Sequence, residues 1–376
     1  MSVLDQLAAD LTTDARVAKE LESIQERFRK AAEELKSARF ANPDGRPRVV
    51  EELPWYVMIG APGSGKTTAL LNSGLRFPLY TANSSASVPG VGGTRNCEWW
   101  FADEAVLLDT AGRYTTQDSD RKADAAAWQG FLALLKQFRP ERPLNGALVT
   151  VSVLDLMLWA KNERAKFAAH VRMRLSEMYA ALNQRFPVYL LVTKLDLLAG
   201  FTEFFGDYDQ VARAQVWGTT LAHDIDPALM APDYAKDFAA LENRLGAEML
   251  ARLHEEPDLQ RRAAIYRFPQ QFHPIGPLLG EFAAQAFGVQ VNHRPVQLRG
   301  IYFTSGTQEG NPIDRVLATM ARTFRLDRNA AALMTGTGKS YFVTRLLREV
   351  VFPEQGLAAV EPPPPAAEDP VAAEPA

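Results

Sequence analysis

Apolar and polar positions follow two spacing patterns along most of this chain, one typical of strands and one typical of helices. Short runs rich in β-branched and aromatic residues predict strands at 55–59, 98–101, 105–109, 147–153, 188–193 and 298–304. Apolar residues spaced three or four apart predict helices at 66–73, 124–138, 161–185, 312–324 and 338–352. Buried strands that alternate with helices are typical of an α/β fold, with a mostly parallel sheet and helices on both faces. The short connection between 98–101 and 105–109 predicts a hairpin, which makes one edge strand antiparallel.

The same patterns divide the chain into five parts. Residues 1–50 are predicted to form an N-terminal helical arm, and residues 51–200 an α/β domain that residues 296–325 complete. Residues 201–295 show no convincing strand and carry aromatic residues, Ala and Leu at helical spacing, which predicts an inserted helical subdomain. Residues 326–356 are predicted to be a C-terminal helical segment. Residues 357–376 are mainly Pro, Ala and Glu, so we expect a disordered tail.

Composition narrows the class of protein without defining its function. Of the 376 residues, 47% are hydrophobic and 23% are charged, which is ordinary for a soluble globular protein. The net charge of −4 gives no basic surplus, so nucleic acid is not expected as a main partner. Cys97 is the single cysteine, so no intramolecular disulfide can form and a reducing compartment is expected. The histidines are scattered, and no apolar run is long enough to predict a membrane span.

One segment carries a specific chemical signal. Gly60 to Thr67 reads G-A-P-G-S-G-K-T and fits the P-loop pattern G-x-x-x-x-G-K-[ST] without a gap. A predicted strand precedes it and a predicted helix follows, which is the context that the motif requires. Glycines allow backbone N–H groups to surround phosphate oxygens, and the helix N-terminus adds positive potential. Lys66 is expected to reach the β- and γ-phosphates and Thr67 to bind Mg²⁺, within a nucleotide-contacting set of Gly60, Ala61, Pro62, Gly63, Ser64, Gly65, Lys66, Thr67 and Thr68.

Two further segments predict the rest of the phosphate site. The strand at 105–109 ends in D-T-A-G, so Asp109 is expected to hold Mg²⁺ through water and the Gly112 N–H to meet the γ-phosphate. The Gly-rich stretch 88–95 contains Thr94, which is well placed to contact both Mg²⁺ and the γ-phosphate. An ordinary loop is the alternative for that stretch. The predicted catalytic set is Lys66, Thr94, Asp109 and Gly112, and the predicted Mg²⁺ ligands are Thr67, Thr94 and Asp109.

A third segment predicts how a base could be recognised. The strand at 188–193 runs into Thr193-Lys194-Leu195-Asp196, which reads T-K-L-D. The Asp196 carboxylate can accept two hydrogen bonds from guanine, which adenine cannot donate, and the Lys194 stem can lie over the base. Because each charge-assisted hydrogen bond contributes about 1.5–3 kcal/mol, we expect at least roughly hundredfold preference for guanine. Ser305 and Gly306 follow the last predicted strand in a loop where a backbone N–H could meet the guanine O6.

The order of these segments matches a small-GTPase plan, with one departure. Arg113 follows D-T-A-G, where hydrolytic GTPases of the Ras type place a glutamine that orients water, so slow or partner-dependent hydrolysis is expected. The run Gly336-Thr337-Gly338-Lys339-Ser340 imitates a second P-loop. It has Leu333 in place of the first glycine and no preceding strand, so we interpret it as a turn.

Several segments together resemble the TssM (IcmF-like) family of type VI secretion membrane-complex proteins. They are Pro54-Trp55-Tyr56 before the P-loop, Gly90-Val91-Gly92-Gly93-Thr94 before Trp99-Trp100-Phe101, Leu108 to Gly112, Arg142 to Gly146, Arg299 to Gly306, and Val350 to Glu354. The resemblance covers roughly residues 45–357. It implies the cytoplasmic part of an inner-membrane anchor whose partners are TssL, TssJ and cytoplasmic baseplate proteins. It also implies membrane spans, and since this sequence contains none, membrane attachment is expected only through segments that this chain lacks.

Three functions remain open on the sequence alone. The first is a guanine-nucleotide switch or slow GTPase that uses GTP, GDP and Mg²⁺ at the cytoplasmic face of the bacterial inner membrane. The second is a structural scaffold in which nucleotide binding is weak or incidental. The third is an ATPase in which Asp196 only ends a strand. The intact Lys66, Thr67 and Asp109 argue against a pure scaffold, and T-K-L-D argues against ATP.

Overall fold

A computed structural model describes residues 53–77, 97–118, 120–222, 230–289, 295–306 and 339–360, together with a few isolated positions between residues 22 and 48. Within these residues, seven strands form one central sheet in the order β4-β5-β3-β6-β8-β10-β9. The parallel strands are β3 (Trp55–Gly60), β5 (Val106–Thr110), β6 (Gly146–Ser152), β8 (Val188–Thr193) and β10 (Leu298–Phe303). The antiparallel edge strands are β4 (Cys97–Phe101) and β9 (Gly218–Thr220). The fold is therefore α/β with a mostly parallel mixed sheet.

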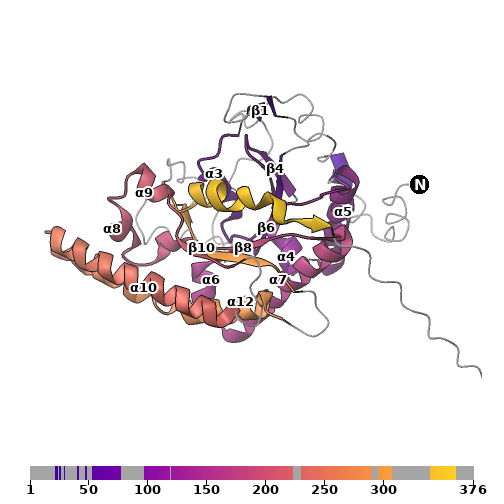
Figure 1. Ribbon diagram of the computed structural model, residues 1–376. Coiled ribbons are helices and arrows are strands. Elements are labelled where there is room, and N and C mark those ends of the chain that lie inside the picture. Colours follow the sequence, from indigo (N-terminus) through magenta and orange to yellow (C-terminus); the bar gives the residue numbers. More distant parts are fainter. Residues whose placement is uncertain are drawn as a thin grey trace, which may run out of the picture.

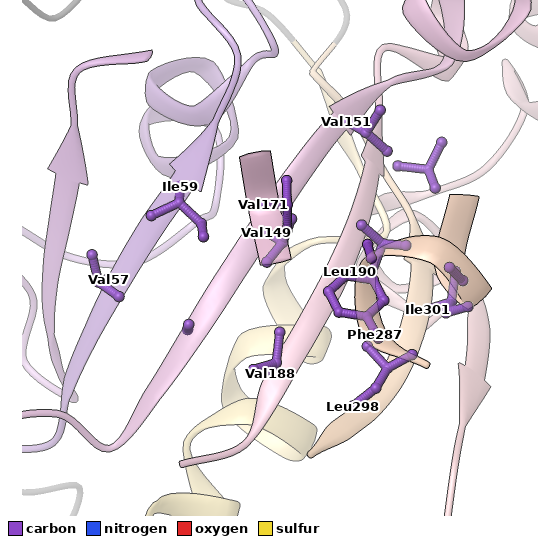
Figure 2. Packing of buried hydrophobic residues seen from close by; sticks show 14 of the residues in the cluster. Val57, Ile59, Val149, Val151, Val171, Val188, Leu190, Phe287, Leu298 and Ile301 are labelled. Atoms are coloured by element: carbon purple, nitrogen blue, oxygen red, sulfur yellow. The ribbon is translucent and has the colours of Figure 1, made fainter. Parts of the chain in front are cut away.

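One face of the sheet carries the larger apolar core. Side chains at every second strand position, such as Val57 and Ile59 of β3 and Val149 and Val151 of β6, pack against helices (Figure 2). Val171 and Phe287 reach this core from two of those helices (Figure 2). The helices packed into this core include α5 (Arg121–Phe138), α6 (Val153–Leu158), α7 (Lys161–Leu182), α10 (Met230–Glu255), α11 (Leu259–Phe272) and α12 (Ile275–Phe287).

The opposite face carries a second apolar cluster, which a different part of the chain covers. Tyr56, Leu148, Tyr189 and Tyr302 point to this side, because side chains alternate between the faces of a sheet. They pack against α3 (Lys66–Leu71) and a C-terminal segment that contains a π-helical turn, η4 (Leu346–Val351), and a 3₁₀ turn, η5 (Pro353–Leu357). In Figure 1, α6, α7, α10 and α12 lie on one side of the sheet, whereas α3 and the yellow C-terminal segment lie on the other.

Smaller elements connect these layers. Short helices are α4 (Gly112–Thr116), α8 (Phe201–Phe205) and α9 (Gln210–Ala214), and η2 (Leu195–Leu197) is a 3₁₀ turn. Three antiparallel pairs join β1 (Phe40–Ala41) with β2 (Pro47–Arg48), β11 (Ser305–Gly306) with β12 (Ser340–Tyr341), and β7 (Gln184–Arg185) with β13 (Ala359–Val360).

The periodic patterns predict most of this architecture correctly. All six predicted strands are present within two residues of their expected bounds, and the β4–β5 hairpin is confirmed. Helix α5 begins at Arg121, earlier than predicted, because the Asp120 side chain caps it by accepting a hydrogen bond from Ala123 N. Helix α7 ends at Leu182 because Asn183 takes a left-handed conformation. The predicted helix at 312–324 lies outside the described residues, as does most of the predicted arm at 1–50.

Three expectations are wrong. The predicted disordered tail begins too early, because Ala359 and Val360 form β13 and pair with β7, a partner far away in sequence. The segment 201–295 contains a strand after all, because β9 pairs with β10 and extends the sheet. The predicted helix at 338–352 is interrupted at its start, where Ser340 and Tyr341 pair with β11 and Phe342 has a φ of 66°. These short strands depend on partners far away in sequence, so no local periodicity reveals them. The division of the chain into five parts stays a prediction.

Candidate functional site

The loop between β3 and α3 has a backbone that only glycine fits well. Gly63 and Gly65 have φ values of 73° and 89°, in the left-handed region. Gly60 has no room for a side chain, since a Cβ there would lie 2.2 Å from Thr150 Oγ1. The three glycines of the sequence motif therefore each serve the path of the loop at the carboxyl end of β3.

Lys66 points back into this loop. Its Nζ donates hydrogen bonds to the backbone oxygens of Gly60, at 3.0 Å, and Ala61, at 3.1 Å. Burial lowers the pKa of Lys66 to about 8, although the nearby Asp109 charge acts in the opposite direction and raises it. The ammonium group thus lies against the backbone oxygens of the loop.

Thr67 and Asp109 meet beside the same loop. Thr67 Oγ1 donates to Asp109 Oδ2 at 2.5 Å. Asp109 stands near the end of β5 in register with Met58 of β3, and Thr110 Oγ1 donates to the Met58 oxygen at 2.6 Å. A hydroxyl and a carboxylate at one point provide the hard oxygen donors that Mg²⁺ prefers. The residues present therefore fit a magnesium ion.

The segment after β5 folds tightly over the loop. A Cβ on Gly112 would lie 2.2 Å from the Pro62 nitrogen, so the backbones of the two segments are in direct contact. The Gly60 N–H donates to Thr115 Oγ1 at 3.0 Å, a contact that the sequence analysis missed. Gly112, for which a phosphate contact is predicted, is thereby brought next to the backbone of the glycine-rich loop.

Arg113 is held by a buried carboxylate. Its Nη1 lies 2.7 Å from Oδ1 of Asp124, a fully buried residue in the first turn of α5. Asp124 also accepts a hydrogen bond from the Asp120 N–H at 3.3 Å. The side chain that follows D-T-A-G therefore links α4 to α5. No sequence signal pointed to Asp124.

A cluster of hydroxyl groups supports the loop from below. Ser64 Oγ and Thr150 Oγ1 are 2.7 Å apart, and Thr193 Oγ1 donates to the Ser64 backbone oxygen at 2.5 Å. Thr193 also donates to the Val151 oxygen at 3.3 Å. Ser64 and Thr193 are predicted to bind nucleotide, and in the structure their hydroxyls join the glycine-rich loop to β6 and β8. A threonine or serine near the end of each adjacent strand is the signal that could have indicated this cluster.

The T-K-L-D segment lies beside the same loop. Lys194 has a φ of 64°, and a Cβ on Gly65 would lie 3.8 Å from Lys194 Cγ. Ser305 Oγ donates to Asp196 Oδ1 at 2.6 Å. Ser305 and Gly306 form β11 rather than the predicted loop, and a Cβ on Gly306 would lie 3.0 Å from Thr68 Cγ2. Gly306 therefore lies against Thr68 of α3, and Lys194 lies beside Gly65 of the loop.

A further carboxyl group lies near this part of the site. Asp155 follows β6, and its burial raises its pKa, while the charge of Lys194 acts against that shift. Thr94, the predicted third Mg²⁺ ligand, lies outside the described residues, and so does most of the imitation P-loop at 336–340.

Comparisons with known proteins establish the family. Residues 121–364 match the family model described as the IcmF-related N-terminal domain. This chain belongs to the IcmF-related family. It is 49% identical over 364 residues to a protein of Pseudomonas aeruginosa PAO1 described as type VI secretion system component TssM1. That alignment covers 96% of this chain and 33% of TssM1, so the chain spans about a third of the relative's length.

A solved structure offers only a distant likeness to this IcmF-related chain. The crystal structure of an S. thermophilus NFeoB variant bound to GDP and AlF4⁻ is 16% identical, and the match covers 62% of this chain and 99% of that one. Its TM-score is 0.25, and a likeness this weak supports no conclusion about fold or function. Among the described residues, none of the helices is long and apolar enough to span a bilayer.

Proposed function

We propose that this chain is a guanine-nucleotide-binding domain with a P-loop NTPase fold of the small-GTPase plan, acting as a slow GTPase or a nucleotide-dependent switch. One observation carries the proposal. Lys66, Thr67 and Asp109 converge at the carboxyl edge of the parallel strands. Ligands of open α/β sheets bind at this edge, outside the strand ends. A scaffold has no need for an ammonium, a hydroxyl and a carboxylate gathered around one glycine-rich loop.

The residues around the loop carry side chains that suit the binding of a nucleoside triphosphate with magnesium. Thr67 and Asp109 would hold the ion, Thr94 would complete its protein ligands, and a bound Mg²⁺ would neutralise charge that develops on the phosphates. Lys66 would turn its ammonium group from the backbone oxygens of Gly60 and Ala61 toward phosphate oxygens. Gly112, packed against Pro62, would present its N–H to the terminal phosphate.

The contact between Ser305 and Asp196 supports guanine rather than adenine as the base. Ser305 Oγ donates to one oxygen of Asp196, which fixes the direction of the carboxylate. A fixed carboxylate can accept from the N1–H and N2–H₂ groups of guanine at a low entropic cost. Adenine has no such pair of donors. An ATPase therefore remains the alternative that a binding experiment must exclude.

The tether on Arg113 supports slow turnover. The side chain that would orient water in a fast hydrolase is here a guanidinium that pairs with Asp124. A guanidinium donates hydrogen bonds but cannot accept one from water, so it cannot act as a general base. Hydrolysis would then depend on water positioned by other groups or by a partner.

Family membership supplies the biological setting of the proposal. The relative named as a type VI secretion system component supports a role in the membrane complex of that system. We expect the chain to lie at the cytoplasmic face of the inner membrane and to dock with TssL, TssJ and cytoplasmic baseplate proteins. Nucleotide state would then control one of these contacts.

A titration of the purified chain with fluorescent GDP, GTP and ATP analogues, with Mg²⁺ and with EDTA, tests the proposal. Guanine nucleotides should bind with an affinity that depends on Mg²⁺. That affinity should exceed the affinity for ATP by roughly two decades. Equal affinity for GTP and ATP would support the ATPase instead. If no nucleotide binds tighter than about millimolar, the scaffold is correct and the proposal is wrong.

A further inference from the structure

The C-terminal segment runs along the sheet, from the carboxyl ends of the parallel strands to their amino ends. We call residues 340–360 the C-terminal strap. It begins as β12 at the carboxyl edge of the strands and ends as β13 beside β7, which precedes β8 at the amino edge. Figure 1 shows it in yellow above β8 and β10. The strap therefore connects the edge that carries the nucleotide site with the opposite edge of the molecule.

At the far edge, the strap is anchored by an ion pair and several hydrogen bonds. Arg299, at the start of β10, donates from Nε to Glu354 Oε2 at 3.0 Å and from Nη2 to Oε1 at 2.5 Å. Tyr189 Oη donates to Glu354 Oε2 at 2.7 Å. Asn145 Nδ2 donates to the Gln355 oxygen at 3.1 Å. The two hydrogen bonds between the Arg299 guanidinium and the Glu354 carboxylate fix both the direction and the distance of this contact.

The middle of the strap is held mainly by apolar packing. Leu346, Leu347, Val351 and Phe352 are buried against the sheet and α3. Directional contacts there include the hydrogen bond that Tyr56 Oη donates to the Val351 oxygen at 2.8 Å and the surface ion pair between Arg348 Nε and Glu104 Oε1 at 2.9 Å. Hydrophobic attraction is non-directional, so it holds the strap on the sheet more firmly than it fixes the position along the strands. We attribute that position chiefly to the two ends, where the strap pairs with β11 and β7 and Glu354 forms its two hydrogen bonds to Arg299.

At the near edge, the strap supports the predicted base-binding residues. Tyr341 of β12 pairs with Ser305 of β11, and Ser305 is the residue whose hydroxyl holds Asp196. The Leu195 N–H donates to the Thr304 oxygen at 3.4 Å, which joins the two loops a second time. A shift of the strap along the sheet would therefore move Ser305, and with it the oxygen of Asp196 that Ser305 orients.

We propose that the C-terminal strap is the positioning element for Asp196, and that Glu354, at the opposite edge of the sheet, sets how firmly the guanine-binding loop is held. This inference rests on the proposed guanine site and adds its regulation. A partner or a force that acts on the chain beyond Val360 could change how the base is bound, because the strap connects that end to Ser305 and Asp196. The phosphate-binding loop has its own contacts to β6 and β8 and would be affected less.

The test compares Glu354→Gln with Glu349→Gln in the full chain. Glu349 lies on the same strap, but its pair with Arg345 is on the surface, with side chains 49% and 43% exposed. Surface pairs of this kind contribute little to stability, so Glu349→Gln is a matched control. Stopped-flow release of a fluorescent GDP analogue should be roughly tenfold faster for Glu354→Gln and unchanged for Glu349→Gln. The preference for GDP over ADP should fall in the same proportion, which a uniform loss of stability would not produce.

A second measurement does not need nucleotide and separates this inference from the proposed function. Hydrogen exchange of the ligand-free proteins should speed up for Glu354→Gln at the amides of Leu195, Thr304 and Ser305, and stay unchanged in β3 and β5. If the parent binds no nucleotide but this exchange pattern appears, the proposed function fails and the coupling stands. Unchanged exchange at these amides, or a uniform increase over the whole sheet, would overturn the inference.

Discussion

The two halves of the candidate site are built differently. On the phosphate side, Lys66 bonds to backbone oxygens only five and six residues away, and Thr67 reaches Asp109 on the adjacent strand. On the base side, Asp196 depends on Ser305, which is 109 residues away, and Ser305 depends on β12. The loop and its lysine are thus a local structure that a short motif can encode, although Asp109 and Thr193 join them from 42 and 129 residues away. The base half is an assembly of distant segments, and anything that moves those segments changes it.

The largest effect is expected from a substitution that disrupts the phosphate side and leaves the base side intact. Lys66→Ala removes the one ammonium that lies inside the loop, so affinity for GTP and ATP alike should fall at least about a hundredfold. Isothermal titration calorimetry measures the loss, and circular dichroism checks that the fold persists. Lys161→Ala is the control, because this lysine on α7 is 78% exposed and pairs with Glu281 at the surface. Equal affinity in Lys66→Ala and the parent would contradict the phosphate role.

A second change breaks only the base side. Asp196→Asn replaces one acceptor oxygen with a donor amide, which faces a donor of guanine and leaves it unpaired. Guanine affinity should fall by roughly ten- to hundredfold, while ATP affinity stays as it was, and preference should shift toward xanthosine nucleotides. Competition titrations of GTP, XTP and ATP against both proteins measure this. A parallel loss of GTP and ATP affinity would mean that Asp196 supports the whole site rather than the base.

The pH dependence of ligand affinity should distinguish the phosphate side from the base side without any substitution. In the proposed site, phosphate would bind the protonated form of Lys66, and burial lowers the pKa of Lys66 in the free protein to about 8. Bound phosphate would raise that pKa, so binding would take up a proton once the free lysine is neutral. GDP affinity should be flat below about pH 7 and decline by at most about tenfold per unit as the pH rises through 8. Guanosine, which lacks phosphate, should show no such decline between about pH 7 and 9 in a fluorescence competition assay.

The smallest effect concerns turnover. Arg113→Gln should leave nucleotide affinity nearly unchanged and raise hydrolysis a few-fold, because a glutamine can accept a hydrogen bond from water and orient it. The substitution also leaves the buried Asp124 without its cation. We expect a loss of about 1–3 kcal/mol in the free energy of unfolding, less than for a fully buried pair because Arg113 is 26% exposed.

A double variant, Arg113→Gln with Asp124→Asn, should recover part of that stability, because both members of the ion pair are then neutral. Denaturant unfolding and phosphate release assays measure the two quantities. If hydrolysis by the parent already reaches about 1 per second or more, Arg113 does not limit turnover.

Most of the sheet could be predicted because burial leaves a regular trace in the sequence. Strands such as β6 and β8 are apolar over their whole length, as expected for parallel strands covered on both faces. The short strands β9 and β12 leave no such trace, because each has only a few residues and pairs with a distant segment. The same limit applies to Asp124 and Thr150, whose roles depend on which helix or strand lies next to the loop.

The sequence by itself determined the glycine-rich loop, the lysine inside it, and the strands that present them. These features depend on backbone conformations and hydrogen bonds that span a few residues, so residue type at fixed spacing is enough. The tertiary structure alone decided that Thr193 supports the loop, that Asp124 holds Arg113, and that the C-terminal strap reaches Ser305. Each of those contacts is a directional bond between elements brought together by non-directional burial, and the sequence pattern records the burial but not the partner.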